Sequence, residues 1–226
     1  MHFTRGRKLA AGAMLLSSVG LLGAAGMAAN AQESTGAAKA GSTFTKADLQ
    51  PLNNGDGGGK ATVTVNGRTL KVSIDAYRLL KAMPHAQHIH FGAKARNECP
   101  SVRDDSNGDH RLSTAEGQPG YGPVRVSLTK SGDTSPDSTL AVDRFPLAKN
   151  GQVHYDRTLK VGDRLAHAIA NGKAVVVLHG IDYNGNGKYD FKGAGKSELD
   201  PSLPAEATDP VLCGVLEVKD GVVTVQ

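Results

Sequence analysis

Residues 60–76 read KATVTVNGRTLKVSIDA, and this stretch decides the fold class. Apolar and polar side chains alternate from Lys60 to Val65 and again from Thr69 to Ala76, as they do in strands that bury one face. Between the two runs, Asn66-Gly67 favours a tight two-residue turn. We therefore predict a β-hairpin at this position.

The chain beyond the hairpin keeps this character. Further strands are predicted at 86–91, 123–129, 139–146, 153–160, 173–179, 211–218 and 222–225. Only residues 163–170 have a helical pattern, with Asp163 as a possible N-cap and Gly172 as a stop. We expect an all-β fold, a Greek-key β-sandwich or flattened barrel of about eight strands with long loops and one short helix.

The N-terminus has the layout of a secretory signal peptide. Arg5, Arg7 and Lys8 precede an apolar, small-residue run that ends in the sequence Ala29-Asn30-Ala31. This pattern predicts cleavage after residue 31 and a secreted protein, with a retained membrane anchor as the alternative. Residues 32–43 are small and polar and predict a flexible leader, so the folded domain should span 44–226.

The charge balance argues against a nucleic-acid partner. The predicted signal removes three of the 26 basic side chains and none of the 22 acidic ones, which leaves 23 against 22. A nearly neutral chain has no electrostatic reason to bind nucleic acid. After signal cleavage no membrane association is expected, and the sequence indicates no oligomeric state.

The chain contains two cysteines, Cys99 and Cys213. An even count in an exported protein favours one disulfide bond, because the compartment outside the cell is oxidising. Two free thiols are the alternative.

Histidines are concentrated in one place. His85, His88 and His90 lie within six residues, and on a strand the last two would point to the same face. His179, which ends the apolar run AVVVLH, is the best candidate for a third ligand. Three imidazoles without a thiolate suit copper. Zinc in the same site is one alternative, and histidines satisfied within the sheet are another.

Residues 105–116, DSNGDHRLSTAE, match the twelve-residue calcium loop. The expected ligands are Asp105, Asn107, Asp109, the carbonyl of Arg111, Ser113 and Glu116. His110 occupies the sixth position, where glycine is usual, so its backbone must adopt a less favoured conformation. A solvated acidic turn is the alternative.

A second, weaker copy of this loop begins at residue 182. Its expected oxygen ligands are Asp182, Asn184, Asn186 and Asp190. The twelfth position is Gly193, so the chelating carboxylate is missing unless Glu198 reaches in. An Asx-rich turn is the alternative.

Four elements in this order resemble Cu/Zn superoxide dismutase. They are H-x-x-H-x-H at 85–90, a cysteine nine residues later, V-V-x-H at 176–179 and C-G-V-L at 213–216. The resemblance covers roughly residues 44–219. The part from Leu49 to His90 is also similar to the CHRD (chordin-type) domain.

The dismutase resemblance implies roles for these residues. His88, His90 and His179 would bind copper, His85 would pack beside the site without binding it, and Cys99 would pair with Cys213. The segment 91–122 contains one histidine, His110, so we expect no zinc as a second metal. Pro210 stands where the family has its active-site arginine.

Two functions are therefore open. The first is superoxide dismutation by copper held on three histidines, with a small anion such as superoxide as the substrate and His110 or solvent as the proton source. The second is a non-catalytic extracellular binding or structural module of the CHRD type, stabilised by calcium and a disulfide.

Overall fold

The hairpin predicted from residues 60–76 is present in the computed structural model, which describes residues 41–219. β2 (Gly58–Asn66) pairs with β3 (Thr69–Tyr77), and the turn consists of Gly67 and Arg68, one residue later than expected. Gly67 has a positive φ of 55°, which glycine adopts without steric cost. The predicted signal peptide, most of the leader and the strand at 222–225 lie outside the described residues.

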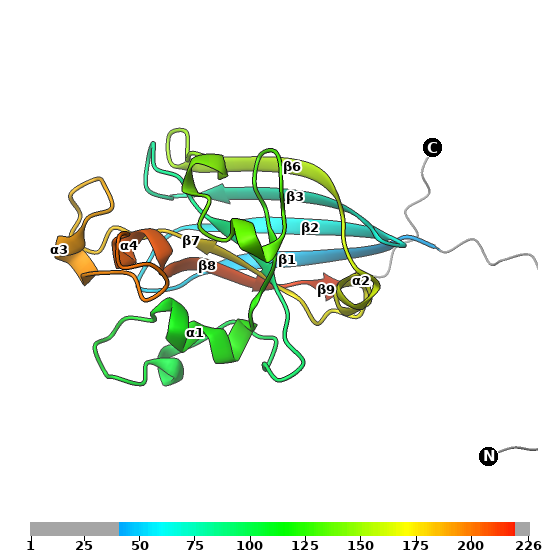
Figure 1. Ribbon diagram of the computed structural model, residues 1–226, viewed down its shortest axis with the longest axis horizontal. Coiled ribbons are helices and arrows are strands. Elements are labelled where there is room, and N and C mark those ends of the chain that lie inside the picture. Colours follow the sequence, from blue (N-terminus) through cyan, green and yellow to red (C-terminus); the bar gives the residue numbers. More distant parts are fainter. Residues whose placement is uncertain (1–40, 220–226) are drawn as a thin grey trace, which may run out of the picture. The chain divides into compact units, whose positions relative to one another are not determined.

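The all-β expectation is confirmed. Within residues 41–219, nine strands form one curled antiparallel sheet in the order β5-β4-β7-β8-β1-β2-β3-β6, with β9 paired to β1. Figure 1 shows β1, β2, β3 and β6 side by side in this order. The remaining strands are β1 (Thr43–Pro51), β4 (Gln87–His90), β5 (Val124–Ser127), β6 (Gln152–Lys160), β7 (Val175–His179), β8 (Pro210–Val215) and β9 (Glu217–Val218). The chain leaves β5 for the far edge at β6 and returns to place β7 beside β4.

Side chains connect the two edges of the curled sheet. Arg157 on β6 donates from Nη1 to the carbonyl of Thr129 (2.7 Å) and from Nη2 to that of Gly132 (2.6 Å), just beyond β5. The hydroxyl of Tyr155 donates to the same Thr129 carbonyl at 3.3 Å. The two edges of the sheet, β5 and β6, are therefore joined by side-chain hydrogen bonds to the segment after β5.

The helices are short. The predicted helix is α2 (Asp163–Ala170), and the structure adds α1 (Thr114–Tyr121), α3 (Phe191–Ala194) and α4 (Ala205–Thr208). Figure 1 shows α3 and α4 together at one end of the sheet and α2 at the other. None of the helices in residues 41–219 is long and apolar enough to cross a bilayer.

The strand predicted at 139–146 was wrong. The 3₁₀ helix η3 (Val142–Arg144) lies within this range, and another, η2 (Pro136–Ser138), ends directly before it. The hydroxyl of Ser135 accepts from the N–H of Asp137 at 3.3 Å and, with Pro136 in the first turn, starts a tight helical turn. The following residues continue in local turns, in which the N–H of Ala141 donates to the carbonyl of Ser138 at 3.1 Å and that of Arg144 to the carbonyl of Ala141 at 2.9 Å. These local bonds use backbone groups that a strand at 139–146 would need.

The curl of the sheet sorts side chains between an inner core and an outer face. Ile89 on β4 and Val176 and Leu178 on β7 are fully buried in the main core. The alternate residues Val175 and Val177 face the other way, where they pack with Tyr121 and Cys213. Because strand side chains alternate, the histidines flanking Ile89 and the one following Leu178 point to this outer face.

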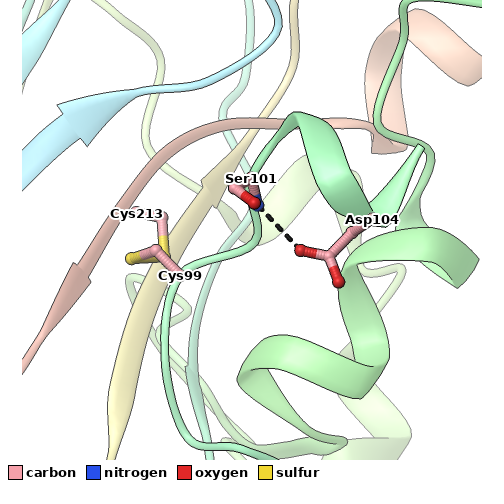
Figure 2. The surroundings of a disulfide bond; sticks show 4 residues. All are labelled: Cys99, Ser101, Asp104 and Cys213. Carbon is pink, nitrogen blue, oxygen red and sulfur yellow. Dashed lines mark hydrogen bonds between the residues drawn. A yellow bond between two sulfur atoms is a disulfide. The ribbon is translucent and has the colours of Figure 1, made fainter.

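The predicted disulfide is present. Cys99 and Cys213 are bonded across a sequence separation of 114 residues, which ties the segment after β4 to strand β8 (Figure 2). Beside it, the N–H of Ser101 donates to Oδ2 of Asp104 at 2.8 Å, part of a capping box that starts η1 (Val102–Asp104) (Figure 2). The bond thus fixes the start of the long connection that contains α1.

Removing this disulfide should destabilise the fold. A loop of this length implies a loss of about 4–5 kcal/mol in the chain-entropy model. We expect the Cys99→Ser/Cys213→Ser double variant to unfold at a clearly lower urea concentration than the oxidised protein. Equal unfolding free energies for the two proteins would contradict this expectation.

Candidate metal centre

Three buried imidazoles converge where β4 meets β7. His88 and His90 come from β4 and His179 from the end of β7, and the two strands pair directly. One potential ligand nitrogen from each ring lies within 4.8 Å of the other two. The rings are only 2–3% exposed. The predicted set is thus confirmed as a group close enough to bind one metal ion.

Each imidazole is held by one backbone carbonyl. Nε2 of His88 lies 3.2 Å from Thr139 O, Nδ1 of His90 lies 2.8 Å from Gly122 O, and Nδ1 of His179 lies 2.6 Å from Thr208 O. Because a carbonyl can only accept, each of these nitrogens carries the proton and donates it. The tautomer of every ring is thereby fixed.

The other nitrogen of each ring has no hydrogen-bond partner among the described residues. These atoms are Nδ1 of His88 and Nε2 of both His90 and His179. Leaving a buried polar atom unpaired costs about 1–3 kcal/mol, so three in one place require an explanation. Metal-binding histidines show this arrangement, with one nitrogen bonded to the protein and the other free to bind the ion.

Burial keeps the three rings neutral. Desolvation, followed by the neighbouring imidazoles, lowers the pKa of His88 well below its usual range. Burial, followed by the neighbouring His179, lowers the pKa of His90 to about 3. Burial lowers the pKa of His179 to about 4, although the hydrogen bond to Thr208 opposes it. Neutral imidazoles are required for metal binding, and these rings are neutral at physiological pH.

Aromatic side chains wall the site. The ring of Tyr121 lies 4.5 Å from that of His90, and the ring of Phe145 lies 5.3 Å from that of His88. A cavity of about 40 Å³ reaches the histidines. Within the described part of the chain, apolar side chains such as Leu140 and Leu203 and a few threonines line it, and no charged side chain does.

His85 lies beside the group and not in it. Its ring is fully buried, with Nδ1 2.9 Å from the carbonyl of His179 and Nε2 3.2 Å from that of Leu80. It therefore contacts the backbone of a candidate ligand. His110, expected near the site as a proton source, is exposed and lines a separate surface hollow with Asp105 and Leu112. The structure does not bring it to the metal centre.

The first oxygen-rich loop is closed by hydrogen bonds to its own backbone. The carboxylate of Asp105 accepts from the N–H of Gly108 (2.7 Å) and of His110 (2.9 Å). His110 has the unusual backbone expected of the sixth position, with φ 63°. Further along, the N–H of Asp109 donates to Asn107 Oδ1 at 2.8 Å and that of Arg111 to Asp109 Oδ1 at 2.9 Å.

Glu116 ties the two ends of this loop together. Its Oε1 accepts from the N–H of Ser106 at 2.9 Å and its Oε2 from the N–H of Ser113 at 3.0 Å, the second and ninth positions. Burial raises the pKa of Glu116, but the bonds from Ser113 and Ser106 outweigh it and lower the pKa to about 2. Glu116 is therefore ionised in the folded protein.

The second loop is also closed by one carboxylate that bonds two of its backbone N–H groups, but this carboxylate comes from a segment outside the loop. Glu206, on α4, accepts from the N–H of Tyr183 (3.0 Å) and of Asp190 (2.7 Å), again the second and ninth positions. A Cβ atom built on Gly193, the twelfth residue, would overlap Glu206 Oε1. Glu198, considered from the sequence, instead accepts from the N–H of Ala115 at 3.1 Å.

The other predicted oxygens of the second loop also accept within the loop. Asp182 accepts from the N–H of Gly187 at 2.7 Å, and Asn184 from that of Asn186 at 3.1 Å. Asn186 donates from its amide to Asp190 Oδ2 at 2.7 Å. A search within a twelve-residue window could not have found Glu206, because it lies on a different segment.

No protein-family model matches the chain, and no curated protein matches it.

The buried histidines predict an acid-sensitive protein. In the metal-free state, the pKa values of about 3 for His90 and about 4 for His179 lie below the ordinary 6.5, so the unfolded chain binds protons first. Stability should be complete above about pH 6.5 and should fall as the pH drops toward 4. Urea midpoints between these values measure this.

The rings themselves provide a control for this prediction. Imidazole proton resonances of His90 and His179 should not titrate between about pH 5 and 8. The pKa of exposed His154 is raised by Asp75 and Asp156, so its resonance should titrate at a higher pH than theirs. A titration of His90 or His179 near 6.5 would contradict the burial described above.

Proposed function

We propose that this protein is an exported copper-binding protein of the superoxide dismutase type. The observation that carries the proposal is the set of three buried imidazole nitrogens without a hydrogen-bond partner among the described residues. Neutral nitrogen donors with no thiolate in the group suit copper, which heads the affinity order for such sites. Zinc is the competing metal, since it also accepts three histidines.

Export is supported by two features. The Cys99–Cys213 disulfide fits an oxidising compartment. The expected signal peptide at residues 1–31 belongs to the same proposal and lies outside the described residues.

The dismutase part of the proposal rests on the positions of the ligands. Bound copper would supply the electron exchange that converts two superoxide ions, with two protons from solvent, into dioxygen and hydrogen peroxide. His88, His90 and His179 would hold the ion through neutral nitrogens, and three protein ligands leave a coordination position open. Tyr121 and Phe145 shield the rings from water.

The lack of a positive charge near the histidines, among the described residues, favours a second candidate, a non-catalytic extracellular module of the CHRD type. Pro210 occupies the place where the resemblance would put an arginine, and it begins β8. The cavity that reaches the histidines has no charged side chain within residues 41–219. A small anion would therefore receive little electrostatic guidance to the site.

Copper binding can be measured directly. The full chain refolded with copper should retain about one ion per molecule after desalting. His90→Ala should lose most of the bound copper, because the variant removes one nitrogen ligand and the ring that packs against Tyr121. His154→Ala, which changes an exposed histidine outside the group, should bind as the wild type does. Equal copper in His90→Ala and the wild type would remove the proposal.

Superoxide consumption separates the two candidate functions. Copper-loaded protein should consume superoxide faster than the same protein loaded with zinc and faster than the copper-loaded His90→Ala variant. Activity equal to that of a free-copper control would leave the extracellular module as the function.

We also propose that the two oxygen-rich loops bind calcium. Calcium takes six to eight oxygen ligands, and each loop gathers side-chain oxygens around a closing glutamate, Glu116 or Glu206. A bound divalent cation would offset the charges of the carboxylates that each loop contains.

A chelator should test the calcium proposal. Removing calcium is expected to lower the melting temperature by several degrees, since an ion that binds only the folded state stabilises it. Asp105→Ala should remove most of this difference, whereas Asp163→Ala, an exposed carboxylate on α2, should keep it. An unchanged melting temperature with and without the ion would end the idea.

A further inference from the structure

We infer that Glu116 and Glu206 are positioning residues of the metal centre, an inference that rests on the metal binding proposed above. Each carboxylate closes an oxygen-rich loop, and each belongs to a short helix next to a carbonyl that holds one of the candidate ligands. Within residues 41–219, neither carboxylate forms a hydrogen bond with His88, His90 or His179. The glutamates act through helix α1 for His90 and through helix α4 for His179.

Glu116 fixes the start of α1. It forms a capping box with Ser113, in which the hydroxyl of Ser113 accepts from the N–H of Glu116 at 3.3 Å while the Glu116 carboxylate accepts from the N–H of Ser113. This cap matters because α1 has eight residues and includes Gly117, Pro119 and Gly120. Glycine and proline are the poorest helix formers, so α1 depends on its end contacts.

The far end of α1 holds His90. Gly122, the C-cap, donates its N–H to the carbonyl of Gln118 at 2.8 Å and uses its own carbonyl to accept from His90 Nδ1. Tyr121 packs its ring against His90 at an interplanar angle of 59°, and its hydroxyl donates to the carbonyl of Thr114 at 2.9 Å. A shift of α1 would therefore rotate the imidazole of His90.

The near end of α1 reaches the second ligand. The hydroxyl of Thr114 donates to the carbonyl of Thr208 at 2.6 Å. The same carbonyl accepts from His179 Nδ1 at 2.6 Å. One oxygen atom thus joins α1, α4 and a candidate ligand.

Glu206 provides the corresponding anchor for α4. This helix has four residues and no side-chain cap, and Glu206 is fully buried in its first turn. Its carboxylate fixes the loop at Tyr183 and Asp190, and its backbone carbonyl accepts from the N–H of Ile181 at 2.8 Å. Thr208, whose carbonyl holds His179, lies two residues further along the same helix.

An ion pair links the two loops. Arg111 of the first loop donates from Nη1 to Oδ2 of Asp209 at 2.6 Å, and the hydroxyl of Tyr183 in the second loop donates to the same oxygen at 3.1 Å. Asp209 directly follows Thr208. The carbonyl that orients His179 is therefore held from both loops, and metal sites need their ligands placed to within about half an ångström.

The test uses glutamine substitutions in the full chain. Glu116→Gln keeps the size of the side chain but replaces one acceptor oxygen with an amide that faces backbone N–H groups. Cobalt(II) serves as the probe metal, because its visible absorption reports the geometry of the ligand set. Affinity is measured by competition with a chromophoric chelator, at a temperature where circular dichroism shows every variant to be folded.

We expect Glu116→Gln to bind cobalt about 10–100-fold more weakly than the wild type and to shift its absorption, as changes behind metal-binding histidines do. Glu206→Gln should behave in the same way. If this variant does not fold, Glu116→Gln alone decides the test, since Glu116 is only half-buried and its substitution disturbs the core less. Glu217→Gln, which breaks an exposed pair with Lys219 on β9, should bind as the wild type does.

The outcomes separate this inference from the proposed function. A wild-type protein that binds neither cobalt nor copper would overturn the proposed function. A wild-type protein that binds cobalt, together with a Glu116→Gln variant of equal affinity and unchanged absorption, would overturn the positioning role and leave the metal site standing. A lower melting temperature alone, with affinity and absorption unchanged, would likewise show a purely structural role.

Discussion

Three buried imidazoles that each donate to a carbonyl and leave a second nitrogen unpaired are the constraint on which the rest of this structure depends. Water would satisfy these nitrogens in the unfolded chain, so their burial opposes folding unless something else binds them. Three such unpaired nitrogens lie in one place, so their desolvation costs add up there. Three of the connections between strands make the arrangement possible, because the β4–β5, β5–β6 and β7–β8 connections each contribute one acceptor carbonyl.

The site divides its two tasks between two kinds of structure. The nitrogen donors come from β4 and β7, which are held by neighbours on both sides in the sheet. The orienting carbonyls of Thr139, Gly122 and Thr208 come from segments outside the sheet, near the 3₁₀ helices η2 and η3, at the end of α1 and in α4. Strands fix where the donors are, and the connections decide where they point.

Much of the donor set could be predicted from the sequence. Spacing on a strand places His88 and His90 on one face, and an apolar run ending in His179 indicates a neighbouring buried strand. Orienting groups could not be predicted, because a backbone carbonyl has the same chemistry in every residue. Helix α1 was missed because two glycines and a proline in eight residues argue against a helix, and only the cap at Ser113 and Glu116 offsets them. Strand β1 was missed because only Thr45, Ala47 and Leu49 face inward, and two of these are small.

Gly193 has a consequence for how such loops are described. The absence of a side chain there leaves room for a carboxylate that arrives thirteen residues later in the chain, on Glu206. A sequence signature of twelve consecutive positions assumes that the closing carboxylate lies within the same twelve residues as the loop. Here the loop and its closing carboxylate lie on separate segments, and the only sign of this in the loop sequence is a glycine at the twelfth position. A signature for this architecture would pair an empty final position with an acidic residue at a variable distance downstream.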